Sequence, residues 1–245
     1  MIVNIFDMRK ILYCLLFAVI LVSCDDSVIK PEEYISKAVL EDFHNRYPGV
    51  KYNTVIGSDG DATFTVIDEL GCKEKVHYYE GKWSGSIKTF NPVIFQSPEY
   101  IEKEIPAKVC DSYMASVGWQ HYHYDNQNYY SQAIHDGRSV DGDVEEIYVF
   151  CYEYEGKSYF LVIDSEGTVL ERKDDHLIRQ DNRFLPDKMS HYLKARSMAQ
   201  EKHPSATIKG MVFYSGAFVL YLSEGYSIFT ESFRYGECDP CYDKQ

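Results

Sequence analysis

The sequence predicts an α+β fold in which short helices each precede and cover an antiparallel β-meander. Two observations favour this class. Short apolar stripes with a helical period recur along the chain, and stretches of alternating apolar and polar residues follow them. A strand that runs into a tight glycine turn also recurs, at Phe64–Gly71, Phe160–Gly167 and Phe218–Gly225. We therefore expect tandem modules, each a short helix packed on an antiparallel meander.

The first residues have the layout of a secretory signal. Arg9 and Lys10 precede an uncharged apolar run that extends to Val22, and charge returns at Asp25. This run is shorter than a membrane-spanning helix, which needs roughly 20 apolar residues. A basic start followed by a short apolar stretch is typical of a signal peptide. We predict that residues 1–23 are such a peptide.

The end of this run, Leu21-Val22-Ser23-Cys24, resembles the lipobox of exported bacterial lipoproteins. In that family the cysteine carries lipid, and several acyl chains anchor a protein stably to a membrane. The resemblance implies cleavage before Cys24, lipidation of Cys24 and a tether over residues 24–31. An ordinary signal peptide with a chance cysteine is the alternative. The expected location is the outer membrane of the cell envelope, in either the periplasmic or the surface-exposed leaflet.

The charge of the chain disfavours one class of partner. With 25 basic and 38 acidic residues the formal net charge is −13, and no basic run interrupts it. Such a field repels phosphate backbones, so we expect no binding of nucleic acid. Apolar residues make up 45% of the chain, which is enough for packed cores rather than disorder.

Cys238-Asp239-Pro240-Cys241 is the sharpest cysteine motif. A redox dithiol would be expected at a helix N-terminus after a strand, and a zinc site needs a second pair of ligands. The motif instead lies in polar sequence near the last residue. We favour a disulfide between Cys238 and Cys241, or no bond at all.

Three segments have the pattern of short one-sided helices. Each bears an apolar stripe with a period near 3.6 residues and ends at a proline or glycine. The stripes need a sheet to cover them. The three segments are residues 32–47, 106–117 and 187–203.

Stretches in which apolar and polar residues alternate predict the strands that follow these helices. No strand–helix–strand alternation with glycine-rich phosphate turns occurs, which disfavours a parallel sheet. Besides the three glycine-turn strands, the predicted strands are Lys75–Tyr79, Glu146–Tyr154, Thr168–Arg172, Thr207–Tyr214 and Tyr226–Phe233.

Two motifs of the first module resemble a known family. The run Phe43-x-x-Arg46-Tyr47-Pro48-Gly49-Val50, followed by strands that close in Tyr79-Glu80-Gly81-Lys82-Trp83, is similar to the PepSY-like group of secreted proteins. The stretches Pro106–Trp119 and Tyr159–Glu171 resemble a further copy. The architecture of this group is similar to the β-lactamase-inhibitor-protein fold. The resemblance implies a binding or inhibitory surface in the cell envelope and supplies no catalytic residues.

The predicted modules divide the chain as follows. The first spans residues 32–95, the second 96–180 with a polar insert near 120–144, and the third, either complete or partial, 181–236. Residues 237–245 form a C-terminal tail.

His121 and His123 are the candidate metal ligands. On a strand they would lie on one face about 7 Å apart, where Asp125 or His135 could complete a site. A surface strand in a tyrosine-rich insert explains the same residues. The Asp-Gly patches around residues 58–61 and 136–143 lack the ligand spacing of a calcium loop, and turns account for them. No cofactor is predicted.

Exposed aromatic residues could form a platform for a sugar or a peptide. For Trp83, packing against a sheet is the favoured interpretation, whereas the polar neighbours of the insert leave both open for its tyrosines. The candidates are Trp83, Trp119, Tyr122, Tyr124, Tyr129 and Tyr130.

None of the common catalytic signatures is present: the sequence has no nucleophile elbow, zinc-protease helix or phosphate loop. We therefore predict a non-enzymatic, lipid-anchored envelope protein that binds a protein or a peptide. The alternatives are a glycan-binding lipoprotein that uses exposed tyrosine and tryptophan, and a hydrolase that uses a pair of carboxylates.

Overall fold

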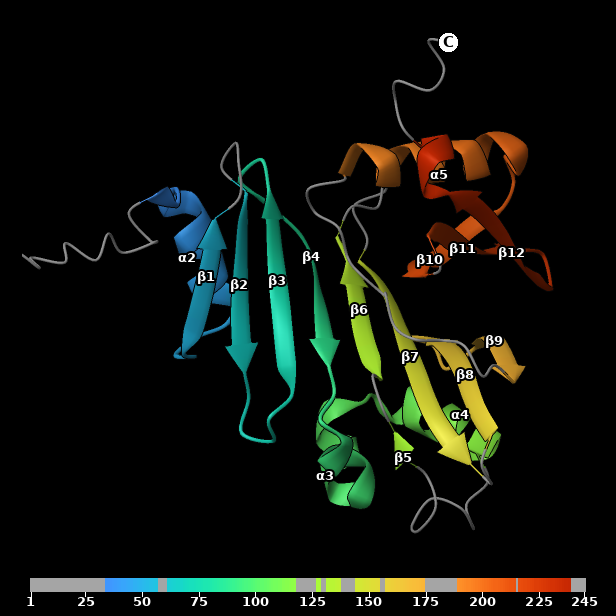
Figure 1. Ribbon diagram of the computed structural model, residues 1–245, viewed down its shortest axis with the longest axis horizontal. Helices are drawn as coiled ribbons and strands as arrows, with labels where there is room; N and C mark the ends of the chain where they lie inside the picture. The colour runs from blue at the N-terminus through green and yellow to red at the C-terminus, as the bar shows by residue number, and fades with distance from the viewer. Residues whose placement is uncertain are drawn as a thin grey trace, which may run out of the picture. The chain divides into compact units, whose positions relative to one another are not determined.

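The computed structural model describes residues 34–56, 61–117, 127–128, 131–137, 144–154, 157–174, 189–214 and 216–238. The chain from Tyr34 onward forms one compact unit. Within the described ranges, no helix combines the length and apolar character that crossing a bilayer requires. Figure 1 shows the helices and strands, whose bounds follow.

Most of the described strands belong to one antiparallel sheet, called sheet A, in the order β1-β2-β3-β4-β6-β7-β8-β9 with β5 paired to β7. Its strands are β1 (Tyr52–Ile56), β2 (Ala62–Ile67), β3 (Lys73–Tyr79), β4 (Lys82–Thr89), β5 (Gln127–Asn128), β6 (Gln132–Asp136), β7 (Glu145–Tyr154), β8 (Lys157–Asp164) and β9 (Val169–Asp174). The second sheet, called sheet B, is an antiparallel meander of β10 (Thr207–Tyr214), β11 (Ala217–Glu224) and β12 (Ser227–Arg234).

One face of sheet A, the helix face, carries the helices that precede its strands. These are α2 (Lys37–Arg46), the 3-10 helix η3 (Pro92–Gln96), α3 (Pro98–Glu104) and α4 (Ala107–Val117). Ser36 caps α2 by accepting a hydrogen bond from the backbone N–H of Val39. Phe43 then stacks on Phe64 of β2 with ring centroids 4.0 Å apart. On α4, Tyr113 stacks in the same way on Phe150 of β7 at 4.4 Å.

The other face of sheet A is covered by sheet B along β4 and β6–β9. A shared core joins the two sheets there, with Ile134, Ile147 and Val149 from sheet A against Val212 and Tyr221 from sheet B. The far side of sheet B packs on α5 (Met189–Lys202). The chain is thus layered as helices, sheet A, sheet B and helix α5 along this part of the sheet.

Two turns of sheet A have the same hydrogen bonds. In the β2–β3 turn, the carboxylate of Asp68 accepts from the backbone N–H groups of Leu70 and Cys72. In the β8–β9 turn, Asp164 accepts in the same way from Glu166 and Thr168. In both, a glycine with positive φ follows, at 78° for Gly71 and 83° for Gly167. These are the Asp-x-x-Gly ends of the first two repeated strands in the sequence.

The α+β class and the three predicted helices are confirmed by α2, α4 and α5. The third glycine-turn strand differs from the other two, because β11 and β12 are joined through a tight turn next to the Glu224–Ser227 pair. Within the segment predicted as a polar insert near 120–144, residues Gln132–Asp136 form β6, a central strand that joins β4 to β7 and buries Ala133 and Ile134.

Candidate functional site

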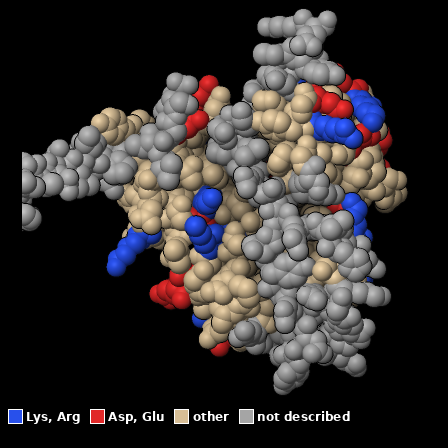
Figure 2. Space-filling model, viewed as in Figure 1, with Lys and Arg blue, Asp and Glu red and all other residues tan. Residues whose placement is uncertain are grey.

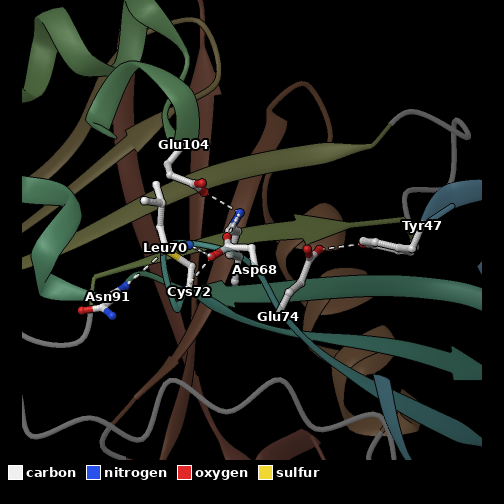
Figure 3. A network of polar contacts seen from close by, with 8 residues as sticks. Tyr47, Asp68, Leu70, Cys72, Glu74, Asn91 and Glu104 are labelled. Carbon is white, nitrogen blue, oxygen red and sulfur yellow. Dashed lines mark hydrogen bonds and ion pairs between the residues drawn. The ribbon is translucent and has the colours of Figure 1, made fainter. Parts of the chain in front are cut away.

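A lysine held between two carboxylates lies where β4 approaches the β2–β3 turn and α3. Lys88 Nζ is 2.9 Å from Asp68 Oδ2 and also contacts Glu104 Oε2. Cys72 ends the same turn, and its Sγ accepts a hydrogen bond from the backbone N–H of Asn91 at 3.4 Å. Figure 3 shows the side chains of Asp68 and Cys72, from the β2–β3 turn, and of Glu104, from α3, pointing toward one another. We call Lys88, Asp68, Glu104 and Cys72 the Lys88 cluster.

The ion pairs of the Lys88 cluster fix its protonation states. Burial disfavours the charged form of Lys88, but hydrogen bonds to Glu104 and Asp68 outweigh burial and raise its pKa. Burial also opposes the charge of Asp68, yet Lys88 and the backbone N–H of Cys72 leave its pKa below the ordinary value. Lys88 is therefore a permanent ammonium near neutral pH and cannot serve as a general base.

The cluster also has the composition of a metal site, because ligand atoms of Asp68, Cys72 and Glu104 all lie within 4.8 Å of one another. Two features oppose that function. The ammonium of Lys88 already neutralises both carboxylates. Burial raises the pKa of the Cys72 thiol to about 11, whereas a metal ligand must be a thiolate. The residues fit an ion-paired structural cluster better than a metal centre.

Replacing Lys88 with methionine is expected to lower the free energy of unfolding at pH 7 by about 2 kcal/mol, because two partly buried carboxylates lose their cation. The lowered pKa of Asp68 contributes stability that is present above its unfolded pKa of about 3.9 and is lost as pH falls through the folded pKa. In the variant, Asp68 keeps its backbone hydrogen bonds from Leu70 and Cys72 but loses Lys88, so the stability lost between pH 7 and pH 4 should be smaller than in the unsubstituted chain. Urea unfolding at both pH values measures this. Lys103→Met, which removes an exposed pair with Glu99, is the control and should change little.

A second polar network joins α5 to sheet A. Arg196 donates to both carboxylate oxygens of Glu145, at 2.8 and 2.6 Å, and to the hydroxyl of Tyr192 at 2.8 Å. Tyr192 in turn donates to Asp136. Glycoside hydrolysis needs two carboxylates that face each other across a cleft with room for substrate. In the Lys88 cluster and in the Arg196 network, the carboxylates instead face a cation or the hydroxyl of a tyrosine. Neither group of residues therefore supports the hydrolase alternative.

The remaining candidate surface is the face of β1–β3 opposite α2, which we call the open face. Strand pairing places Asn53, Thr65 and Lys75 in one row across these strands. The next partners in the row are Ile87 and then Ile134, both buried under sheet B. The row therefore changes from exposed and polar to buried and apolar between β3 and β4. The residues of the open face are Asn53, Thr63, Thr65, Ile67, Lys73 and Lys75.

The open face combines hydrogen-bonding, apolar and basic groups. Asn53, Lys73 and Lys75 are exposed, and Thr65 is half-buried. Ile67, which pairs with Lys73, is 61% exposed although it is a large aliphatic residue. Figure 2 views this face, where basic side chains, with a small acidic patch between them, stand out from a mostly uncharged surface. The sequence analysis did not single out these residues, although their alternation along β2 and β3 could have indicated a solvent-facing side.

Trp83 is not part of an exposed platform. Its side chain is half-buried and packs against the core beneath α2. The guanidinium of Arg46 lies over its ring, 4.4 Å from the centroid, and Gly137 approaches the ring so closely that a Cβ there would lie 2.3 Å from a ring carbon. The ring is thus occupied by the protein itself, in agreement with the packing interpretation.

The other candidates of the sequence analysis lie outside the described residues, and their functions stay predictions. They are Cys24, Trp119, His121, Tyr122, His123, Tyr124, Tyr129, Tyr130 and Cys241.

The described cysteines Cys72, Cys110, Cys151 and Cys238 form no disulfide with one another. Burial raises the pKa of Cys151 to about 12 and that of Cys238 to about 11. Such thiols are poor nucleophiles at neutral pH. Because Cys241 is not described, pairing of Cys238 with it is neither confirmed nor contradicted.

No family model matches the chain, and no curated protein does. Several solved structures are similar to part of it. A BLIP-like protein from Bacteroides fragilis is 15% identical, with 61% of this chain and 91% of that chain covered and a TM-score of 0.40. A DUF2874 family protein from Bacteroides ovatus is 13% identical, with 62% and 97% covered and a TM-score of 0.38.

A further similar structure is a protein from Bacteroides eggerthii whose assignment to the periplasm is provisional. It is 13% identical, with 58% of this chain and 89% of that chain covered and a TM-score of 0.37. At such identities and TM-scores, no ligand, partner or activity carries over to this chain.

Proposed function

We propose that the chain is a non-enzymatic binding protein of the bacterial cell envelope, built from related helix-and-meander modules and tethered by lipid on Cys24. Its ligand is a protein or a peptide, which it binds through the open face. The main support is the uneven covering of sheet A. Along β4 and β6–β8 both faces are buried, whereas one face of β1–β3 keeps exposed side chains.

The open face suits a protein ligand better than a glycan. Sugar sites depend on aromatic rings that stack on the sugar, and none of the six residues of the open face is aromatic. Threonine and asparagine side chains supply donors and acceptors for a peptide, and exposed Ile67 supplies apolar contact. A glycan platform would have to be built elsewhere.

Site-specific photo-crosslinking in cells that make the protein tests this function. A photoreactive residue at Ile67 should give one discrete adduct with an envelope protein, identified by mass spectrometry. The control is the same residue at Leu193 of α5, a similarly exposed aliphatic position at 48%. Binding of the identified protein in purified form should then be lost in Thr65→Arg, which blocks the face. Identical adducts from both positions, or none from Ile67, would contradict the proposal.

A further inference from the structure

The charges of the open face are all positive. Among the six residues of the open face, Lys73 and Lys75 are the charged ones, because strand alternation turns Glu74 to the helix face. There Glu74 accepts a hydrogen bond from the hydroxyl of Tyr47 at 2.6 Å. His77 lies on the same side as the lysines, across from Thr63, but it is buried. The open face thus carries two positive charges in a chain whose formal net charge is −13.

Lys73 and Lys75, like Lys51 beside β1 and Lys82 on β4, have no carboxylate partner among the residues that the structure describes. Acidic residues nevertheless outnumber basic ones in the chain. By contrast, Lys88 on the opposite face of the neighbouring strand holds two carboxylates, and Lys37 on α2 pairs with Glu41. Within the described ranges nothing neutralises the exposed ammonium groups of Lys73 and Lys75, which suits them to an anion from outside the chain.

The spacing of the two lysines selects the form of that anion. As residues i and i+2 of β3 they point to the same side, about 7 Å apart. Carboxylates on alternate residues of an extended peptide have the same separation. Thr65 lies directly across from Lys75, and Ile67 across from Lys73, so each ammonium has a side chain beside it that can contact a peptide.

From these observations we infer that the open face binds an extended acidic protein segment with carboxylates on alternate residues, which pair with Lys73 and Lys75. This inference rests on the proposed function and specifies its ligand. Charge complementarity favours such a segment, because the rest of the chain repels acidic partners and directs them to this face. Two lysines are too few for stable binding of a phosphate backbone against the net negative charge.

A peptide of alternating glutamate and threonine, ten residues long, is a suitable probe. Titrated into the isotope-labelled full chain, it should shift NMR signals of β2 and β3, and its affinity should fall as salt is added. A peptide with lysine in place of each glutamate should not bind. A peptide with the same composition but its glutamates in one block should bind more weakly, because only alternate carboxylates match the lysine spacing.

The variant Lys73→Gln/Lys75→Gln should weaken binding of the alternating peptide roughly tenfold, with about equal contributions from the two lysines. The matched control is Lys37→Gln/Lys103→Gln, which removes the same charge from exposed helix positions, at 89% and 59% exposure, and should leave the affinity unchanged.

Three results would overturn the inference: equal binding by the Lys73/Lys75 variant, equal weakening by the control, or preference for an acidic polysaccharide such as polygalacturonate. The crosslinking result at Ile67 separates this inference from the proposed function. If a protein adduct forms there but its affinity is unaffected by Lys73→Gln/Lys75→Gln, the open face binds protein without the acidic recognition inferred here. If Ile67 gives no adduct, the proposed function fails as well.

Discussion

Replacing Arg196 with methionine is expected to lower the free energy of unfolding by about 3–5 kcal/mol, one of the two largest effects of any substitution proposed for this chain. The guanidinium is 9% exposed and holds both oxygens of Glu145, whose side chain is 13% exposed. Methionine keeps the apolar stem but leaves that carboxylate buried without a cation. The hydroxyl of Tyr192 also loses its donor. Equilibrium unfolding in urea at pH 7 measures the change.

A second substitution distinguishes loss of the ion pair from loss of packing. If the unpaired Glu145 carboxylate causes most of the effect, the double variant Arg196→Met/Glu145→Gln should recover a large part of the lost stability. Both remaining side chains are then neutral. A double variant no more stable than Arg196→Met would assign the effect to packing instead. A loss below about 1 kcal/mol in Arg196→Met would show that the pair behaves as an exposed one.

Gly167→Ala is expected to cost about 3 kcal/mol or more. Gly167 has φ of 83°, where an L-residue with a Cβ is disfavoured by roughly 1–2 kcal/mol. A Cβ there would also lie 2.7 Å from the carbonyl oxygen of Lys108, in the backbone of α4, and 3.1 Å from Ser112 Oγ. The helix would have to move away from the turn, which would break the hydrogen bond from Ser112 to the Gly167 carbonyl.

The related turn and an open turn provide matched controls for this glycine. Gly71→Ala at φ 78° would meet only the side-chain amide of Asn91, which can rotate away, so a smaller loss is expected. Gly225→Ala at φ 60° has no atom within 4 Å of the added Cβ. Its loss of stability should therefore be roughly 1 kcal/mol, the cost of a left-handed backbone conformation for alanine. Urea midpoints that fail to rank Gly167 above Gly71 and Gly225 would contradict the role given to the α4 contact.

The periodic sequence predicts α2, α4, α5 and most long strands, but it misses η3, α3 and the two neighbouring strands β4 and β6. Strand β4 contains Ser84, Gly85 and Ser86, which have low strand propensity, and yet all three are buried. Ser84 is accommodated because its hydroxyl donates to the His77 carbonyl. Strand β6 is short and lies in polar sequence, so only its neighbours on either side reveal it as central. Tertiary pairing outweighs local preference in both cases.

The repeated strand also shows a limit of sequence comparison. Phe64 and Phe160 occupy the same place in the repeat, but Phe64 packs on α2 whereas Phe160 packs against sheet B. Strand β8 is apolar on both sides, with Leu161 facing α4 and Val162 facing sheet B, so either orientation buries apolar side chains. A motif in such a strand cannot specify which residue faces the helix.

The Lys88 cluster could not be predicted because its residues come from three elements that are distant in sequence. Asp68 was recognisable as the end of the repeated strand, whereas nothing near Lys88 or Glu104 indicates that they meet. The open face was in principle accessible to sequence reasoning. Lys73 and Lys75 alternate with inward residues along β3, but which side of the strand lacks a covering layer depends on where sheet B ends.

Because sheet B is the last sheet of the chain to be synthesised, the face of sheet A that it covers is exposed until synthesis is complete. A chain that leaves the ribosome from its N-terminus finishes β4 to β9 before β10 and β11 exist. Until then Ile87, Ile134, Ile147 and Val149 form a bare aliphatic surface that water disfavours by roughly 1.5–3 kcal/mol for each side chain. A copy that is truncated or clipped ahead of Thr207 keeps that surface permanently. Such fragments should adhere to one another or to chaperones, whereas in the finished chain sheet B covers this surface.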